Sequence, residues 1–273
     1  MIFANAEQII RNGRTKETKK IREDVLLILD AALNAVDSYE AVKKHIKKQS
    51  FFECSKRGSI YLLAFGKASV PMAQAACNTL NIKKGIVITN DAKNKVHHKN
   101  LETLVADHPI PTDRNIKATE QAVSMIKKTK KEDLLIILIS GGGSALLCKP
   151  RVPLQDVQII TDLLLKSGAD IKEINTIRKH LSHVKGGQLA KLANCSIISQ
   201  IISDVVSDPI EFIASGPTAP DSTTYKDAKK ILQEHNLWNN TPKSIKETIN
   251  KGIKGEIAET PKPGDRFFQK VKN

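Results

Sequence analysis

A run of six apolar residues, 134–139, leads directly into the loop Ser140-Gly141-Gly142-Gly143-Ser144. An apolar run without a polar break is typical of a strand that is buried on both faces of a parallel sheet. Three consecutive glycines let the backbone turn sharply and approach a ligand closely. A helix that begins near Ser144 would direct free N–H groups into the turn, which favours phosphate or carboxylate. A tight strand-to-helix connection without a ligand is the alternative.

The loop lacks both standard nucleotide-binding motifs. A phosphate loop of the Walker type would need Gly-Lys-Ser/Thr at its end, and Gly143 is followed by Ser-Ala-Leu. A dinucleotide fingerprint that uses Gly141 and Gly143 would need a third glycine at position 146, which is leucine. A nicotinamide or Walker-type site is therefore disfavoured.

Apolar runs and helical patterns alternate along the rest of the chain. Ile21, Val25, Leu29 and Leu33 recur at helical spacing and predict one or two helices within residues 20–48. This alternation predicts a mostly parallel α/β sheet with flanking helices and an N-terminal helical segment. The predicted strands are 59–65, 85–89, 103–106, 134–139 and 196–203, and the predicted later helical regions are 154–193, 224–235 and 242–250.

Composition excludes several classes of protein. The net charge is +14, but the basic pairs are dispersed and aromatic residues make up only 4%, so we expect no nucleic-acid partner. No apolar stretch approaches the roughly 20 residues that span a bilayer, and the N-terminus has no signal-peptide pattern. The cysteines lie far apart, which favours reduced thiols and a cytoplasmic protein. They are Cys54, Cys77, Cys148 and Cys195.

Polar clusters follow the predicted strands. Lys67 comes after the first strand, Asp107-His108 after the third, the glycine loop after the fourth and Asp204 after the fifth. In open parallel sheets, ligands bind beyond the carboxyl ends of the strands. We therefore expect these clusters to meet in one crevice, with Lys67 in contact with a phosphate or the substrate.

A polar stripe follows in residues 175–187. Asn175, Arg178, Ser182 and Lys185 are spaced to share one face of a helix, opposite an apolar face. Two cations, an amide and a hydroxyl suit a carboxylate or polyphosphate, and Gly186-Gly187 would end the helix and allow a close backbone approach. A solvated surface stripe is the alternative.

Two aspartates, Asp204 and Asp208, lie just past the fifth predicted strand. A carboxylate at a strand end can coordinate magnesium or accept a hydroxyl proton. Capping of the loop by its own backbone hydrogen bonds is the alternative for either residue.

Taken in order along the chain, these motifs resemble the glycerate 2-kinase family. The resemblance runs from about Ile21 to Gly264 and is specific because the motifs occur jointly. It is carried by Phe65-Gly66-Lys67-Ala68, Asp107-His108-Pro109-Ile110-Pro111, Ser140 to Leu146, Arg178 to Ser182 with Lys185-Gly186-Gly187, Ile202 to Val205, Ala214 to Thr218 and Asp221 to Thr224.

The resemblance implies transfer of phosphate from ATP to the 2-hydroxyl of D-glycerate, or of a related hydroxy acid, with Mg²⁺. It implies a Rossmann-like three-layer domain over residues 1–262. It also assigns catalytic contact to Lys67 and an anion cradle to residues 140–144. From position, Asp204 is our candidate for the base or magnesium contact, with Asp208 as a second metal ligand.

The chain departs from the family in two ways. Ser207-Asp208 stands where the family has Gly-Asp. The family continues into a smaller C-terminal domain, and residues 263–273 look like a stub of the linker to it. The expectation is then impaired activity unless a separate chain supplies that domain. A hydroxypyruvate reductase and an inactive anion-binding remnant are the alternative functions.

Overall fold

The computed structural model describes residues 2–48 and 58–273, so that Cys54 lies outside the described residues. Its strands are β1 (Ile60–Phe65), β2 (Ile82–Thr89), β3 (Leu101–Val105), β4 (Leu134–Ile139), β5 (Ser196–Ile201) and β6 (Val271–Lys272). Its α-helices are α1 (Ala6–Arg11), α2 (Lys16–Ala35), α3 (Ser38–Lys48), α5 (Ser69–Cys77), α6 (Asp113–Lys127), α7 (Gly143–Leu146), α8 (Leu154–Lys166), α9 (Ile171–His180), α10 (Gln188–Lys191), α11 (Tyr225–Glu234) and α12 (Lys243–Ile253). Two 3₁₀ helices, η1 (Ile213–Ser215) and η2 (Arg266–Lys270), complete the described elements.

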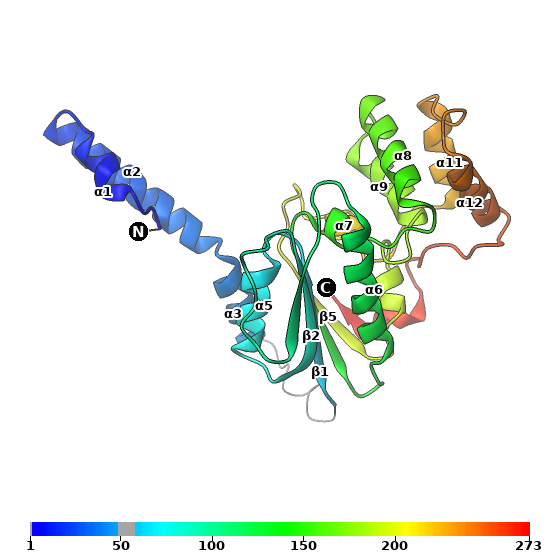
Figure 1. The fold of residues 1–273 in the computed structure, drawn as a ribbon, viewed down its shortest axis with the longest axis horizontal. Helices are drawn as coiled ribbons and strands as arrows, with labels where there is room; N and C mark the ends of the chain where they lie inside the picture. The colour runs from blue at the N-terminus through cyan, green and yellow to red at the C-terminus, as the bar shows by residue number, and fades with distance from the viewer. Residues whose placement is uncertain (1, 49–57) are drawn as a thin grey trace.

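A parallel sheet with the strand order β3-β2-β1-β4-β5-β6 lies at the centre of the molecule (Figure 1). Its central strand β4 is buried along its whole length, because all six of its residues are apolar. The chain leaves β1 first toward β2 and β3, and returns to the other side of β1 as β4. The carboxyl ends of β1 and β4 thus flank the point where the strand order reverses, which is where such sheets bind ligands.

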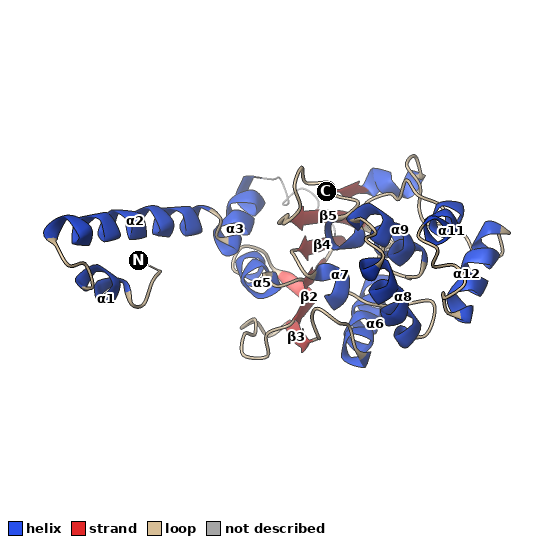
Figure 2. Ribbon diagram, turned by 90° about the horizontal axis from the view of Figure 1, so that it is seen from above, coloured by secondary structure: helices blue, strands red, loops and turns tan. Residues whose placement is uncertain are grey.

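Helices cover both faces of the sheet and make three layers (Figures 1 and 2). One apolar cluster packs α3 and α5 against one face, with Ile46 and Met72 fully buried. Another packs α6 against the opposite face, with Ala122 and Ile126 fully buried. The predicted α/β class is confirmed.

Helices α8, α9, α11 and α12 form an apolar cluster of their own beside the sheet (Figure 1). The region predicted as one long helical stretch over 154–193 is divided here into α8, α9 and α10. Asp170 caps α9 and forms a capping box with Glu173, which explains the break before it. The predicted helices 224–235 and 242–250 correspond to α11 and α12.

The two ends of the chain differ in their packing. Helices α1 and α2 project away from the sheet, and only Leu26 of α2 is buried among its described residues (Figures 1 and 2). At the other end, Val271 and Lys272 pair with Ile197 and Ile198 and extend the sheet by one strand. These last residues were expected to form a linker stub, and no strand was predicted there.

Candidate functional site

The glycine loop connects β4 to the short helix α7, and the atoms around its glycines leave little room for side chains. A side chain at Gly141 would meet the carboxylate of Asp204, since a Cβ there would lie 2.1 Å from Oδ2. Gly142 has a φ of 84°, in the left-handed region that favours glycine. A Cβ on Gly143 would lie 2.7 Å from the methyl group of Ala214. The three glycines therefore allow neighbouring segments to approach the loop closely.

Ser140 joins this loop to the turn after β1. Its hydroxyl accepts a hydrogen bond from the Ala68 amide at 3.0 Å, and the Lys67 amide donates to the Gly141 carbonyl at 2.9 Å. The two turns at the switch point are thus held together, and Lys67 is fixed beside the loop. In the described parts of the chain, the amides of Gly141, Gly142 and Ser144 donate to no carbonyl group. Of these residues, Gly142 and Ser144 line the pocket described next, where their N–H groups are available to an anion.

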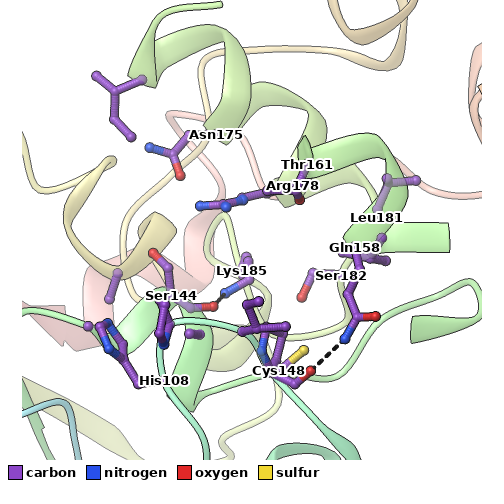
Figure 3. Close-up of a pocket in the computed structure, with 18 of the residues that line it drawn as sticks. His108, Ser144, Cys148, Gln158, Thr161, Asn175, Arg178, Leu181, Ser182 and Lys185 are labelled. Atoms are coloured by element: carbon purple, nitrogen blue, oxygen red, sulfur yellow. Dashed lines mark hydrogen bonds between the residues drawn. The ribbon is translucent and has the colours of Figure 1, made fainter. Parts of the chain in front are cut away.

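A pocket of about 470 Å³ lies against this loop (Figure 3). Gly142 and Ser144 of the loop line it, with Lys185 beside Ser144, and Asn175 and Arg178 line it from helix α9. Aliphatic residues line much of the rest. They include Ile110, Val157, Leu165 and Ile171.

All four residues of the polar stripe line the pocket, but the prediction that they share one face of a single helix is wrong. Helix α9 ends at His180, so Ser182 and Lys185 do not lie on the same helix as Asn175 and Arg178. Ser182 instead forms an isolated antiparallel bridge with Pro150. This pairing turns the chain back toward the pocket, so the stripe converges through tertiary contacts.

Arg178 also carries its charge in a partly buried position. It is largely buried, and burial lowers the pKa of its guanidinium below the usual value. Within residues 2–48 and 58–273, no carboxylate lies within ion-pairing distance of Arg178. A buried cation without a protein counter-charge favours an anionic ligand.

Asn175 is held in place by hydroxyl groups. The Ser215 hydroxyl donates to its Oδ1 at 2.8 Å, and Ser215 in turn lies 3.0 Å from the hydroxyl of Ser144. The side chain of Asn175 is almost fully buried, yet its residue lines the pocket. This chain of hydrogen bonds connects the helical wall to the glycine loop.

Lys185 forms hydrogen bonds with the backbone at the end of the glycine loop. Its Nζ donates to the carbonyl oxygens of Ser144 at 2.6 Å and Leu147 at 3.2 Å. Burial lowers the pKa of Lys185 to about 8, with a smaller contribution from the charge of Arg178. Lys185 therefore adds a positive charge to the pocket and also fixes the carbonyl end of α7.

Gly186 and Gly187 lie outside the lining of the pocket. Their amides donate to the carbonyl oxygens of Ser215 at 2.9 Å and Gly216 at 2.7 Å. Both glycines have positive φ angles, so they form a turn that packs against the 214–217 segment. These amides have backbone acceptors already, unlike those of the glycine loop.

The two aspartates are separated by the structure. Asp204 packs on Gly141 and lines the pocket, whereas Asp208 lines a different depression near β5 and α3. Among the described residues, no group of three or more His, Cys, Asp and Glu side chains is arranged to hold a metal ion. Only Asp204 is therefore positioned beside the expected phosphate site.

His108 lines the pocket although sequence reasoning gave it no individual role. A Cβ on Gly142 would lie 3.0 Å from its Cδ2 atom and 3.3 Å from the Cγ of Lys67, so both side chains stand over the loop. Burial, with a contribution from Lys67, lowers the pKa of His108. Asp107 instead binds Arg114 and Thr112. The position of His108 after the third strand was the available signal.

Cys148 is the second pocket residue that sequence reasoning passed over. Burial raises the pKa of its thiol, although Lys185 and Arg178 act in the opposite direction. Burial therefore favours the neutral thiol, and nothing in its spacing along the chain predicted this position.

Comparisons with known proteins agree with this architecture. A family model described as a domain of unknown function, DUF4147, matches residues 24–250. The chain is 42% identical over 250 residues to a glycerate 2-kinase of Pyrococcus horikoshii. The aligned region covers 89% of this chain and 57% of that relative. The crystal structure of a Thermotoga maritima glycerate kinase superposes with a TM-score of 0.80 at 36% identity, over 91% of this chain and 56% of that one.

A third relative carries a different name. It is an Agrobacterium vitis protein named as a hydroxypyruvate reductase, 36% identical over 94% of this chain and 58% of its own length. The chain thus spans a little more than half the length of the relatives that it matches. No helix in the described ranges is both long and apolar enough to cross a membrane. The expected resemblance is confirmed, and the chain belongs to the DUF4147 family, which it shares with proteins named glycerate 2-kinase.

Proposed function

We propose that this chain forms the substrate-binding part of a kinase that transfers the terminal phosphate of ATP to the 2-hydroxyl of D-glycerate. The observation that carries the proposal is Arg178, a largely buried guanidinium without a protein carboxylate, which lines the same pocket as Gly142 and Ser144 of the glycine loop. Two separate groups of anion-binding donors suit a reaction that joins a carboxylate substrate to a phosphate donor.

Each wall has its own role in this proposal. Arg178, with Asn175 and Ser182, binds the carboxylate and hydroxyl groups of glycerate. The amides of Gly141, Gly142 and Ser144 bind phosphate oxygens, and Lys67 neutralises charge beside them. Lys185 holds the loop carbonyls so that the amides remain directed into the pocket.

In the chemical step, the 2-hydroxyl oxygen of glycerate attacks the terminal phosphorus atom, its proton leaves to Asp204, and ADP departs. Asp204 fits this position because it packs on Gly141 and lines the pocket. As its alternative role, the same carboxylate would hold Mg²⁺, whose charge would neutralise the phosphate oxygens when bound. Asp208 points to another depression and is at most an indirect contributor.

The relatives are longer than this chain, so we propose that full activity requires a further polypeptide segment that closes the pocket. Residues 1–262 would then be the α/β domain, with the rest leading toward that segment. Such a segment can belong to a separate chain. Absence of a charge-stabilising contact from it can reduce phosphoryl transfer by several orders of magnitude.

The test is ADP release with D-glycerate and ATP-Mg²⁺, for the chain alone and with the unmatched remainder of the Pyrococcus horikoshii kinase added as a folded fragment. The proposal predicts glycerate-dependent ADP release that increases strongly with the fragment and that Arg178→Gln abolishes. Lys172→Gln, at an exposed position of the same helix, is the matched control. NADH consumption with hydroxypyruvate, without ADP release, would favour the reductase. Binding of both substrates without turnover in the reconstituted sample would contradict the kinase and favour an anion-binding remnant.

A further inference from the structure

The imidazole of His108 lies over the glycine loop and has no part in the reaction proposed above (Figure 3). A Cβ on Gly142 would lie 3.0 Å from its Cδ2 atom and 3.1 Å from its Nε2 atom, so the edge of the ring that carries Nε2 faces this glycine. Ser144 lies beside the ring in Figure 3. The Nε2 atom is thus a neighbour of the loop amides that are available to an anion.

Neither ring nitrogen of His108 has a hydrogen-bond partner within residues 2–48 and 58–273. The carboxylate of the preceding residue, Asp107, is bound to Arg114, whose Nε donates to its Oδ2 at 3.0 Å. A neutral imidazole has one N–H donor, and the group that binds the ring decides which nitrogen carries the proton. A ring that lines the pocket without a partner in the described chain is therefore available to a ligand.

The charged neighbours of His108 make it a neutral donor. The Cγ of Lys67 would lie 3.3 Å from the same Cβ on Gly142, so the two side chains share one side of the loop. Burial, with a contribution from Lys67, lowers the pKa of His108, and the ring is neutral at pH 7. Asp204 packs instead on Gly141, the previous residue of the loop. Lys67 therefore supplies positive charge beside the loop, and His108 supplies a directed hydrogen bond without further charge.

We propose that the Nε2–H group of His108 donates a hydrogen bond to the terminal phosphate of the nucleotide at the glycine loop, an assignment that rests on the proposed kinase function. A terminal phosphate presents three oxygen atoms, and the amides of Gly142 and Ser144 supply two donors. His108 supplies a third donor from the side of the loop. The carboxylate of glycerate has only two oxygens, and the N–H groups of Arg178 match them. His108 is therefore a contact of the nucleotide and not of glycerate.

The test is calorimetric titration of the full chain with Mg²⁺ and the non-hydrolysable ATP analogue AMP-PNP and, separately, with D-glycerate. His108→Leu removes the donor, so we expect about 10-fold weaker binding of AMP-PNP and an unchanged affinity for D-glycerate. His108→Gln places an amide N–H near the position of Nε2 and should bind AMP-PNP within about 3-fold of the wild type. His97→Leu, at an exposed histidine of the loop after β2, is the matched control. Thermal melts should show that all variants fold, because the ring of His108 is only partly buried.

A second measurement follows the imidazole itself. In protein with isotope-labelled histidine, the Nε2 resonance of His108, assigned by its loss in His108→Gln, should shift with AMP-PNP and stay in place with D-glycerate. Unchanged binding of AMP-PNP by His108→Leu, equal weakening by the Leu and Gln variants, or a shift with D-glycerate alone would overturn this assignment and leave the kinase proposal standing. A wild-type chain that binds neither ligand would overturn the kinase proposal together with this assignment.

Discussion

The positively charged side chains on the two sides of helix α9 differ in whether they pair with a carboxylate. On the side facing away from the pocket, Lys179 is fully buried with its Nζ 3.2 Å from Asp221 and 3.5 Å from Glu211. His180 lies 3.2 Å from Glu259 on that same side. On the pocket side, Arg178 has no such carboxylate in the described chain. Adjacent residues of one helix thus separate a structural ion pair from a cation that is available to a ligand.

The carboxylates on the paired side respond to this environment. Burial alone raises the pKa of Asp221, but Lys179 and hydrogen bonds from Thr223 lower it below its usual value. Burial also acts to raise the pKa of Glu259, yet the bonds from His180 and the Tyr225 amide bring it down to about 2. These groups stay ionised at neutral pH and tie the 259–262 segment to the back of the helix. Lys179 is therefore unavailable to a substrate.

The largest expected effect is on stability, at the paired side. Asp221→Ala leaves Lys179 buried with only the more distant Glu211, and we expect a loss of about 3–5 kcal/mol in the free energy of unfolding, because an uncompensated buried charge is costly. Urea denaturation measures this loss. The double variant Lys179→Met, Asp221→Leu removes both charges and should recover most of it. A loss below about 1 kcal/mol in the single variant would show that the pair is not structurally important.

The next effect is on binding, at the pocket side. Arg178→Gln should reduce the affinity for D-glycerate by about 10–100-fold, since a charge-assisted hydrogen bond contributes roughly 1.5–3 kcal/mol. The melting temperature should stay the same or rise, because the variant removes a buried charge without a partner. Calorimetry and thermal melts measure the two quantities on one sample. Loss of stability together with unchanged affinity would contradict this prediction, because Arg178 would then serve the fold and not the ligand.

The pH dependence of binding should follow Lys185. Its pKa is lowered to about 8, so the free protein loses this positive charge as the pH rises through 8. Affinity for an anion should therefore be full at pH 7 and fall by up to about 10-fold toward pH 9 to 10. Arg178→Gln should bind more weakly and shift the fall to higher pH, because the charge of Arg178 contributes to the lowered pKa of Lys185, whereas Lys185→Met should lose the fall. A flat profile in the wild-type chain would contradict a charge contribution from Lys185.

Folding stability should change in the opposite direction over that range. The folded-state pKa of Lys185 is below its usual value of 10.5, so the unfolded chain binds more protons between pH 8 and 10.5. The contribution of this group to stability then rises with pH across that window. Urea denaturation at pH 7.5 and 9.5, for the wild type and Lys185→Met, separates this contribution from that of other groups.

The smallest effect is expected at Lys67, whose side chain is exposed beside the glycine loop. Lys67→Ala should weaken binding of an ATP analogue by about 2–5-fold, because solvent screens an exposed charge. The melting temperature should not change, since the fixed contact of this residue is made by its backbone amide. Calorimetric titration measures the affinity, with Lys93→Ala in the exposed loop after β2 as the control. An equal decrease in both variants would mean that only the net charge matters.

The sequence predicted the sheet well because its strands are apolar runs with clear ends. The run 134–139 coincides with β4, and the segment 196–203 contains β5. Strand β6 was not predicted, since two residues at a sheet edge carry no periodic signal. The strand-end rule also brought Lys67, the glycine loop and Asp204 together, because parallel strands end at the same edge of a sheet.

The helical wall was harder to predict. Its apolar spacing continued past His180 without a glycine or proline, and only the bridge between Ser182 and Pro150 ends the helix there. The same reasoning could not separate Arg178 from Lys179, because their partners Asp221 and Glu211 are far away in the sequence. Likewise, the open amides of the glycine loop and the occupied amides of Gly186-Gly187 look alike as glycine clusters. Long-range contacts decide both distinctions.

The central claim is that Arg178 is the cation that binds the carboxylate of the substrate in the pocket. A crystal structure of the chain with D-glycerate tests it most directly. The account predicts the glycerate carboxylate paired with the Arg178 guanidinium, inside the pocket between Asn175 and the glycine loop. Glycerate bound elsewhere, or Arg178 paired with a carboxylate of the protein while the ligand occupies the pocket, would contradict it.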